Sequence, residues 1–323
     1  MQHFIQQANL LGSQKQPFFF LIDFEQQKPL IFPLEQAVGN GIFFAFPQQT
    51  NIQSQQKPVE QFELNIVPTD FAKYQQAFEL VQQQIQAGNS YLLNLTCQTE
   101  ISTNYTLKNL FFASQAKYKL LLQDQFVCFS PECFVRIENN KIYSYPMKGT
   151  INANEANAAE KLLNSQKEFT EHNTIVDLIR NDLALVSKNI QVMKYRYLEK
   201  VETHRGAIYQ TSSEICGELP ENWQVQIGSI LAKLLPAGSI SGAPKVKTVE
   251  IIQQAEQQKR GYYTGIFGYF DGENLESAVA IRYIEQQNGK YYFRSGGGIT
   301  ALSSLNDEYN EILEKIYVPI STL

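Results

Sequence analysis

The sequence has few of the residues that build disulfide frameworks or zinc sites. Its 323 residues include four cysteines, three histidines and one tryptophan. The cysteines lack CxxC spacing and have no histidine cluster near them, so neither a disulfide framework nor a zinc site is predicted. We expect all four to be reduced core residues: Cys97, Cys128, Cys133 and Cys216.

The sequence also lacks long apolar runs and an excess of basic charge. The early run FFFLI at 18–22 is too short for the core of a signal peptide or for a membrane span. The formal net charge is -5, and no basic stripe suited to nucleic acid is present. These absences predict a cytoplasmic protein that binds neither nucleic acid nor a membrane.

The patterns that are present predict an α+β chain. The short apolar pieces FFFLIDF and GIFFAF within residues 1–60 predict antiparallel strands. Apolar residues at 71, 74, 78, 81 and 85, followed by a glycine, predict a helix over 71–87. CFVRI and KIYSYP predict a hairpin around ENN, and the polar segment 152–187 is expected to be helical. One integrated domain is favoured, because we find no repeat and no linker.

The C-terminal part of the chain shows a change of period. From RGYYTGIFGYF to SGGGI the residues alternate with period two around DG and NG turns, which predicts a meander of three strands. NDEYNEILEKIY then predicts a closing helix.

Two carboxylate pairs occur at helical spacing. KEFTEH holds Glu168 and Glu171, and DEYNEILEK holds Glu308 and Glu311. A spacing of i,i+3 places each pair on one helix face, and a single pair of this kind is usually solvated surface. Four converging carboxylates would repel one another, and a hard divalent cation would neutralise them. We therefore predict a Mg²⁺ site.

Two glycine-rich stretches and one lysine are further candidates. PAGSISGAPK at 236–245 lacks the GxxxxGK[ST] pattern, so ATP binding is not predicted, but free backbone N–H groups at the following helix could face a site. SGGGI at 295–299 is either a bulged strand or a stretch whose amides approach an anion. Lys148 in YPMKGT ends a predicted strand, where a lysine is usually solvated.

Taken in order, these stretches resemble the chorismate-binding enzymes. This family includes anthranilate synthase component I, aminodeoxychorismate synthase component I, isochorismate synthase and salicylate synthase. The resemblance covers roughly residues 65–320 and rests on AGNSYLLNLT, SPE, YPMKGT, KEFTEHNTIVDLIRNDL, GSISGAPK, RGYYTGIFGY, AIRYI, GGGI and DEYNEILEK. It implies two large antiparallel β-sheets packed face to face with flanking helices. Residues 1–64 would be a short strand-rich part of the same domain, and 65–320 the chorismate-binding catalytic domain.

The resemblance implies roles for the acidic residues. Glu171 and Glu311 would hold Mg²⁺, which binds the ring carboxylate of chorismate, with Glu168 and Glu308 in support. Glu132 of SPE would be the general acid that protonates the departing hydroxyl group.

The resemblance also implies a substrate-binding set. Arg282 and Tyr263 would hold the pyruvyl carboxylate, joined by amides of GGGI and by Lys315, while Thr150 would lie beside the ring. A bidentate arginine and a metal ion would then bind the two carboxylates of one substrate. The whole set is Arg282, Tyr263, Thr150, Gly149, Gly296, Gly297, Gly298, Lys315, Gln210 and Ser239.

Lys148 discriminates between activities within the family. Anthranilate, isochorismate and salicylate synthases usually have alanine there, whereas aminodeoxychorismate synthases have lysine. The lysine would attack carbon 2 of the ring with loss of the hydroxyl from carbon 4, and ammonia would then enter at carbon 4, which is covalent catalysis by an amine. We therefore predict aminodeoxychorismate synthase component I, a step toward 4-aminobenzoate and folate.

Two departures from relatives favour the same prediction. Leu92 stands where the water-using members have a lysine, so isochorismate and salicylate formation are disfavoured. Gln210 aligns with a histidine associated with pyruvate elimination, so the product should keep its enolpyruvyl group.

We expect neither a glutaminase nor a fused lyase in this chain, since it has no Cys nucleophile motif of a glutaminase. Ammonia is therefore expected from a separate glutamine amidotransferase subunit, and another enzyme should release 4-aminobenzoate. Two alternatives stay open: anthranilate synthase component I, and a non-catalytic chorismate-family binding subunit.

Overall fold

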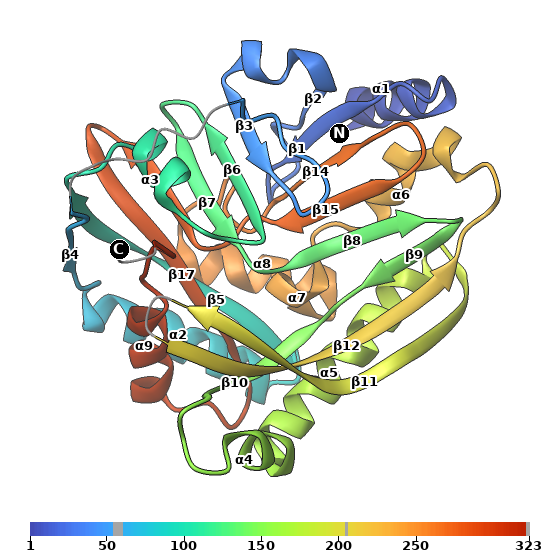
Figure 1. The fold of residues 1–323 in the computed structure, drawn as a ribbon. Helices are drawn as coiled ribbons and strands as arrows, with labels where there is room; N and C mark the ends of the chain where they lie inside the picture. Colours follow the sequence, from blue (N-terminus) through green and yellow to red (C-terminus); the bar gives the residue numbers. More distant parts are fainter. Residues whose placement is uncertain (54–60, 204–205, 321–323) are drawn as a thin grey trace.

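A computed structural model describes residues 1–53, 61–203 and 206–320. Two antiparallel β-sheets form its centre (Figure 1). The first, sheet A, has the strand order β10 (Met147–Asn152), β12 (Gly206–Glu218), β9 (Lys141–Ser144), β8 (Cys133–Glu138), β15 (Leu275–Val279), β14 (Ile266–Phe270), β1 (Phe18–Ile22) and β2 (Leu30–Pro33), and β11 (Lys188–Thr203) also pairs with β12.

The second sheet, sheet B, runs across the other half of the molecule. Its order is β13 (Gly242–Ala243), β5 (Leu92–Thr103), β17 (Lys290–Ile299), β16 (Tyr283–Gln287), β7 (Phe126–Ser130), β6 (Tyr118–Leu122) and β3 (Ile42–Ala45), and β4 (Leu64–Val67) also pairs with β5.

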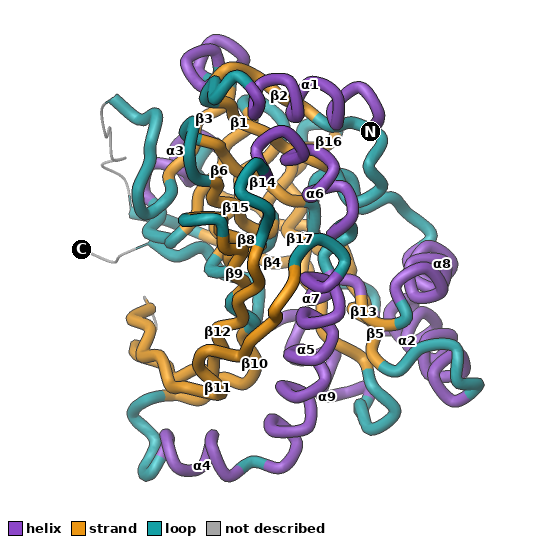
Figure 2. The backbone as a smooth tube through the Cα atoms, turned by 90° about the vertical axis from the view of Figure 1, so that its right-hand side faces the viewer, coloured by secondary structure: helices purple, strands orange, loops and turns teal. Residues whose placement is uncertain are grey.

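Helices cover the faces of the sheets that do not face each other. They are α1 (Gln2–Ser13), α2 (Phe71–Gln86), α3 (Leu107–Ala113), α4 (Ala158–Asn164), α5 (Gln166–Ala184), α6 (Ile227–Leu234), α7 (Gly238–Ser241), α8 (Lys245–Glu256) and α9 (Leu305–Glu314), with the short 3-10 turns η1 (Leu34–Gln36), η2 (Val38–Asn40) and η3 (Trp223–Gln226). In Figure 2, α1, α6, α7, α5, α8 and α2 gather on one side of the strands. Among the described residues, no helix is long and apolar enough to span a membrane.

The strand β1 shows why the two sheets pack face to face. Its residues are buried on both faces, which explains the uninterrupted FFFLI run. Side chains alternate along a strand, so Phe18 and Phe20 join the core beneath the helices while Phe19 joins the core between the sheets. There Phe19 stacks on Phe44 of β3, with ring centroids 5.3 Å apart. The predicted fold class, two antiparallel sheets with flanking helices, is confirmed.

Several local predictions are also confirmed. The helix α2 buries Tyr74, Phe78, Val81 and Ile85, and it begins after Asp70, whose side chain accepts a hydrogen bond from the N–H of Ala72 at 3.0 Å. The hairpin of β8 and β9 and the closing helix α9 form as predicted.

Three local predictions need correction. Residues 2–13 form α1, which buries Phe4, Ala8 and Leu11 at helical spacing, whereas the apolar pieces within residues 1–60 predict only strands. The predicted helix over 152–187 is two helices that begin only at residue 158. The predicted three-strand meander is four strands divided between sheets, since β14 and β15 lie in sheet A and β16 and β17 in sheet B. The domain boundary at residue 64 stays a prediction.

Candidate active site

Lys148 lies on β10, at the edge of sheet A, where the strand bulges. The register with β12 shifts between Lys148 and Thr150, and Gly149 between them has φ +79°, a conformation that favours glycine. A Cβ atom on Gly149 would lie 2.6 Å from Oε2 of Glu168, so a side chain there would displace the Glu168 carboxylate. The hydroxyl of Thr211 donates to the Lys148 carbonyl. The bulge therefore changes the direction of the strand at Lys148. The Glu168 carboxylate packs against the strand at Gly149.

The first acidic pair comes from α5, beside this bulge. Nζ of Lys148 lies 3.7 Å from Oε2 of Glu171, and the two side chains are 24% and 20% exposed. This is a loose ion pair rather than a short hydrogen bond, so both groups are positioned to take other partners.

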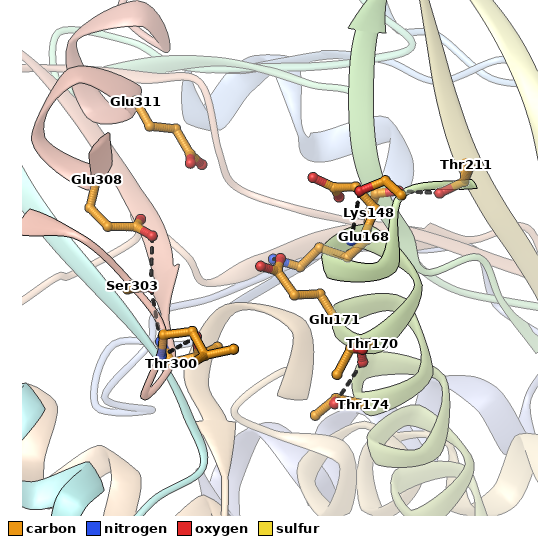
Figure 3. A network of polar contacts seen from close by, with 12 residues as sticks. Lys148, Glu168, Thr170, Glu171, Thr174, Thr211, Thr300, Ser303, Glu308 and Glu311 are labelled. Carbon is orange, nitrogen blue, oxygen red and sulfur yellow. Dashed lines mark hydrogen bonds and ion pairs between the residues drawn. The ribbon is translucent and has the colours of Figure 1, made fainter. Parts of the chain in front are cut away.

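The second acidic pair comes from α9. Glu308 is buried and accepts a hydrogen bond from the Ser303 hydroxyl at 2.7 Å. A Cβ atom on Gly297 would lie 2.9 Å from Oε2 of Glu308 and 3.6 Å from Oε1 of Glu311. Both carboxylates thus lie close to the glycine residues of β17. Figure 3 shows this pair across an open space from Lys148 and Glu171.

The four glutamates suit a hard divalent cation by their chemistry. Carboxylate oxygen is the ligand that Mg²⁺ takes, and the carboxylates of the two helices point toward the same space (Figure 3). Within the described ranges, no three acidic, histidine or cysteine side chains are gathered closely enough to form a ready-made metal site. Glu311 instead accepts a hydrogen bond from Lys315 at 2.6 Å.

Three cationic groups, Lys315, Arg282 and Lys148, lie within electrostatic reach of one another. Lys315 donates to the carbonyl of Gly296 at 2.8 Å as well as to Glu311. Burial lowers the pKa of Lys315, Arg282 and Lys148 act in the same direction, and Glu311 opposes them. Arg282 has φ +52°, where the chain passes from β15 to β16, and its guanidinium lies 5.3 Å from the ring centre of Tyr317. Three cations close to one another favour an anionic ligand.

Glu132 follows β7 and meets a residue distant in sequence. Its Oε1 accepts a hydrogen bond from the Ser239 hydroxyl at 2.5 Å. Burial raises the pKa of the Glu132 carboxyl, and the opposing effects of Ser239, Lys148 and Arg282 do not cancel that rise. A carboxyl with a raised pKa is suited to act as a general acid.

Glu132 and Ser239 line one hollow, and a second hollow adjoins Ser239. Of the residues predicted from the sequence, Lys148, Ser239 and Gly298 line this second hollow. A Cβ atom on Gly298 would lie 3.2 Å from Nζ of Lys148. The absence of a side chain at Gly298 therefore lets the lysine amine approach the backbone of β17. Sequence reasoning did not single out Asn94, which lines the hollow two residues after Leu92. The alternation of β5 was the available signal, since it places 92 and 94 on one face.

Three predicted residues do not line this hollow. Gln210 pairs with Thr150, and its amide donates to Sδ of Met147 and to Glu199. Because side chains alternate along β10 and β12, Gln210 shares the face of Met147, opposite to Lys148. The substrate-binding role of Gln210 stays a prediction. Thr150 is exposed, and the buried ring of Tyr263 lies in the core between the sheets, 5.7 Å from the ring of Tyr283.

Comparison with known proteins agrees with this geometry. A family model described as chorismate binding enzyme matches residues 4–321. The chain belongs to this family. An uncharacterized PabA-like protein of Pasteurella multocida is 62% identical over 98% of this chain and 98% of its own length.

Two further members of the family carry named activities. The aminodeoxychorismate synthase component 1 of Escherichia coli is 32% identical over 76% of this chain, which spans 56% of that protein. The crystal structure of anthranilate synthase component I from Streptococcus pneumoniae has a TM-score of 0.68 at 26% identity, over 84% of this chain and 61% of that one. Both activities thus occur among the relatives, and residues of the site must distinguish them.

Proposed function

We propose that this chain is the chorismate-converting component of an aminodeoxychorismate synthase. The observation that carries the proposal is the position of Lys148, whose amine enters the hollow beside Gly298 and Glu171. An amine in that position can act as a nucleophile, which the alanine of the alternative, anthranilate synthase component I, cannot do.

The proposed reaction has two displacements. The lone pair of the Lys148 amine forms a bond to carbon 2 of the chorismate ring, both double bonds of the ring diene shift by one position, and the bond from carbon 4 to its hydroxyl breaks. Glu132 gives its proton to the hydroxyl, which leaves as water. Ammonia then bonds to carbon 4, both double bonds shift back, and the bond from carbon 2 to the lysine breaks, which restores the amine. The proton lost by the added nitrogen returns to the Glu132 carboxylate.

Binding is assigned to the charged groups around the hollow. Arg282 and Lys315 would hold the pyruvyl carboxylate of chorismate, which suits the anion-favouring charge of this region. Glu171 and Glu311, with Glu168 and Glu308 beside them, would hold Mg²⁺, which when bound supplies positive charge for the ring carboxylate. Ammonia would come from a separate glutaminase subunit.

Intact-protein mass spectrometry tests the proposal. Chorismate and Mg²⁺ without ammonia should leave part of the protein heavier by the mass of chorismate less one water, and peptide mapping should place the addition on Lys148. The variant Lys148→Ala should show no adduct and no 4-amino product. A Lys148→Ala protein that forms 4-amino product at the wild-type rate would contradict covalent catalysis.

A further inference from the structure

The short helix α7 is held in place by a partly buried ion pair. Nζ of Lys245 lies 2.7 Å from Oδ1 of Asp182, and these side chains are 20% and 11% exposed. Oδ2 of Asp182 also lies against Gly238, the first residue of α7, where an added Cβ atom would be 2.7 Å away. The ion pair therefore joins α5, which carries Asp182, to the first residues of both α7 and α8.

Two more contacts complete this support. Lys245 donates to the carbonyl of Leu234, the last residue of α6, at 3.0 Å. Arg260 donates to the carbonyl of Ile240 at 3.0 Å. The residues on both sides of Ser239 are thus tied to neighbouring elements, and Asp182 and Lys245 together fix the segment 234–245.

The side chain of Ser239 has one direct polar contact that the structure records, its 2.5 Å hydrogen bond to Oε1 of Glu132. We propose that Ser239 is a positioning residue for Glu132, and that the Asp182–Lys245 pair, through α7, sets the position of Ser239. This inference rests on the proposed function, in which Glu132 is the general acid. With Oε1 accepting from Ser239, the proton that Glu132 gives to the leaving hydroxyl is carried on Oε2.

The positioning role differs measurably from a substrate-binding role for Ser239. Loss of a substrate ligand raises KM for chorismate, whereas loss of a group that orients the acid lowers kcat and leaves KM nearly unchanged. The two roles also differ in pH dependence. Glu132 must be protonated to act, so kcat/KM falls as the pH rises through its pKa. A donor to the carboxylate lowers that pKa, so its removal moves this decline to higher pH.

The decisive experiment compares Ser239→Ala with Ser241→Ala in turnover of chorismate with Mg²⁺, at a fixed concentration of free ammonia across the pH range. Ser241 lies in the same helix, but its hydroxyl donates to the carbonyl of Ala237. We expect Ser239→Ala to lower kcat about 10-fold and to move the decline of kcat/KM upward by about 0.5–1 pH unit. Ser241→Ala should leave the pH profile of the wild type unchanged.

The outcomes separate this inference from the proposed function. If Ser239→Ala retains the wild-type kcat and pH profile while Glu132→Gln is slow, the positioning role is wrong and the acid assignment stands. If Glu132→Gln is as fast as wild type, the proposed function has the wrong acid. A rise in KM alone for Ser239→Ala would make Ser239 a substrate ligand and overturn the inference.

A second pair of variants tests the support beneath Ser239. Asp182→Asn removes the charge that holds Lys245 but keeps a side chain of nearly the same size against Gly238. It should move the pH profile in the same direction as Ser239→Ala, with activity expressed per folded molecule. Lys247→Gln breaks the exposed ion pair with Glu250 on α8, the helix that also carries Lys245. This variant should not move the pH profile. An Asp182→Asn protein with the wild-type profile would show that the ion pair does not set the position of Ser239.

Discussion

Two groups of charge in the molecule are built in opposite ways. Arg260 and Glu256 are 1% and 0% exposed, and the guanidinium donates to both carboxylate oxygens at 2.6 and 3.0 Å. It also donates to the carbonyls of Ile240 and Asn94. Lys148 and Glu171 instead lie 3.7 Å apart and remain partly exposed. Arg260 and Glu256 form their hydrogen bonds within the protein. Lys148 and Glu171 are held less tightly and can bind a ligand.

The difference follows from what each group has to do. A buried charge is tolerated when it is paired and fully hydrogen-bonded, and such a network holds its neighbours in one arrangement. Here it ties β5, α7 and α8 together behind the hollow. A group that binds substrate must change partners during the reaction, so a loose pair at the edge of the hollow suits that role. Substitutions should therefore affect stability in one group and activity in the other.

The largest effect is expected at Glu171. Glu171→Ala should abolish Mg²⁺-dependent turnover, because removal of a charged ligand leaves a hard cation under-coordinated. The free energy of unfolding should change by less than about 1 kcal/mol, since the lost ion pair is loose and partly exposed. Product formation and urea unfolding of the same sample measure both effects. Glu250→Ala on α8 is the control, and full activity of Glu171→Ala would remove the metal assignment.

The next effect concerns Glu132. Glu132→Gln should slow turnover by about 10²–10⁴-fold, because an amide cannot protonate the leaving hydroxyl. Chorismate binding should be preserved, since the size and polarity of the side chain hardly change. Steady-state kinetics together with calorimetric titration of chorismate separate the two, and a variant as fast as wild type would require another acid.

The buried pair should respond in stability. Arg260→Met should lower the free energy of unfolding by about 3–5 kcal/mol, because it leaves Glu256 buried without its partner. The double variant Arg260→Met, Glu256→Gln should recover part of this loss, which denaturant unfolding can measure. A loss below about 1 kcal/mol in the single variant would show that the two groups of charge do not differ as described.

The smallest effect is expected for reaction of the cysteine thiols in the folded protein. All four are buried, and burial raises the pKa of each thiol. The native protein should therefore react hardly at all with a thiol reagent at neutral pH, whereas four thiols should react in denaturant. A thiol that reacts rapidly in the folded protein would identify a site outside both groups of charge.

Much of the fold could be predicted because the signals are local. The apolar period of α2, the alternation of β8 and β9 and the acidic spacing of α9 each act within one element. The division of β14 to β17 between two sheets could not be predicted. Alternation shows that a strand has two faces, but not which sheet it joins.

The candidate site divides in the same manner. The sequence by itself determined which side chains can do chemistry, since Lys148, Glu132 and the two acidic pairs stand in recognisable motifs. Only the tertiary structure decided which of them meet. Glu132 and Ser239 are 107 residues apart and form a hydrogen bond, while Gln210, which pairs with Thr150 near Lys148, faces the other way. A contact between distant segments depends on how sheets and helices pack, and a strand's face depends on a register that the bulge at Gly149 shifts.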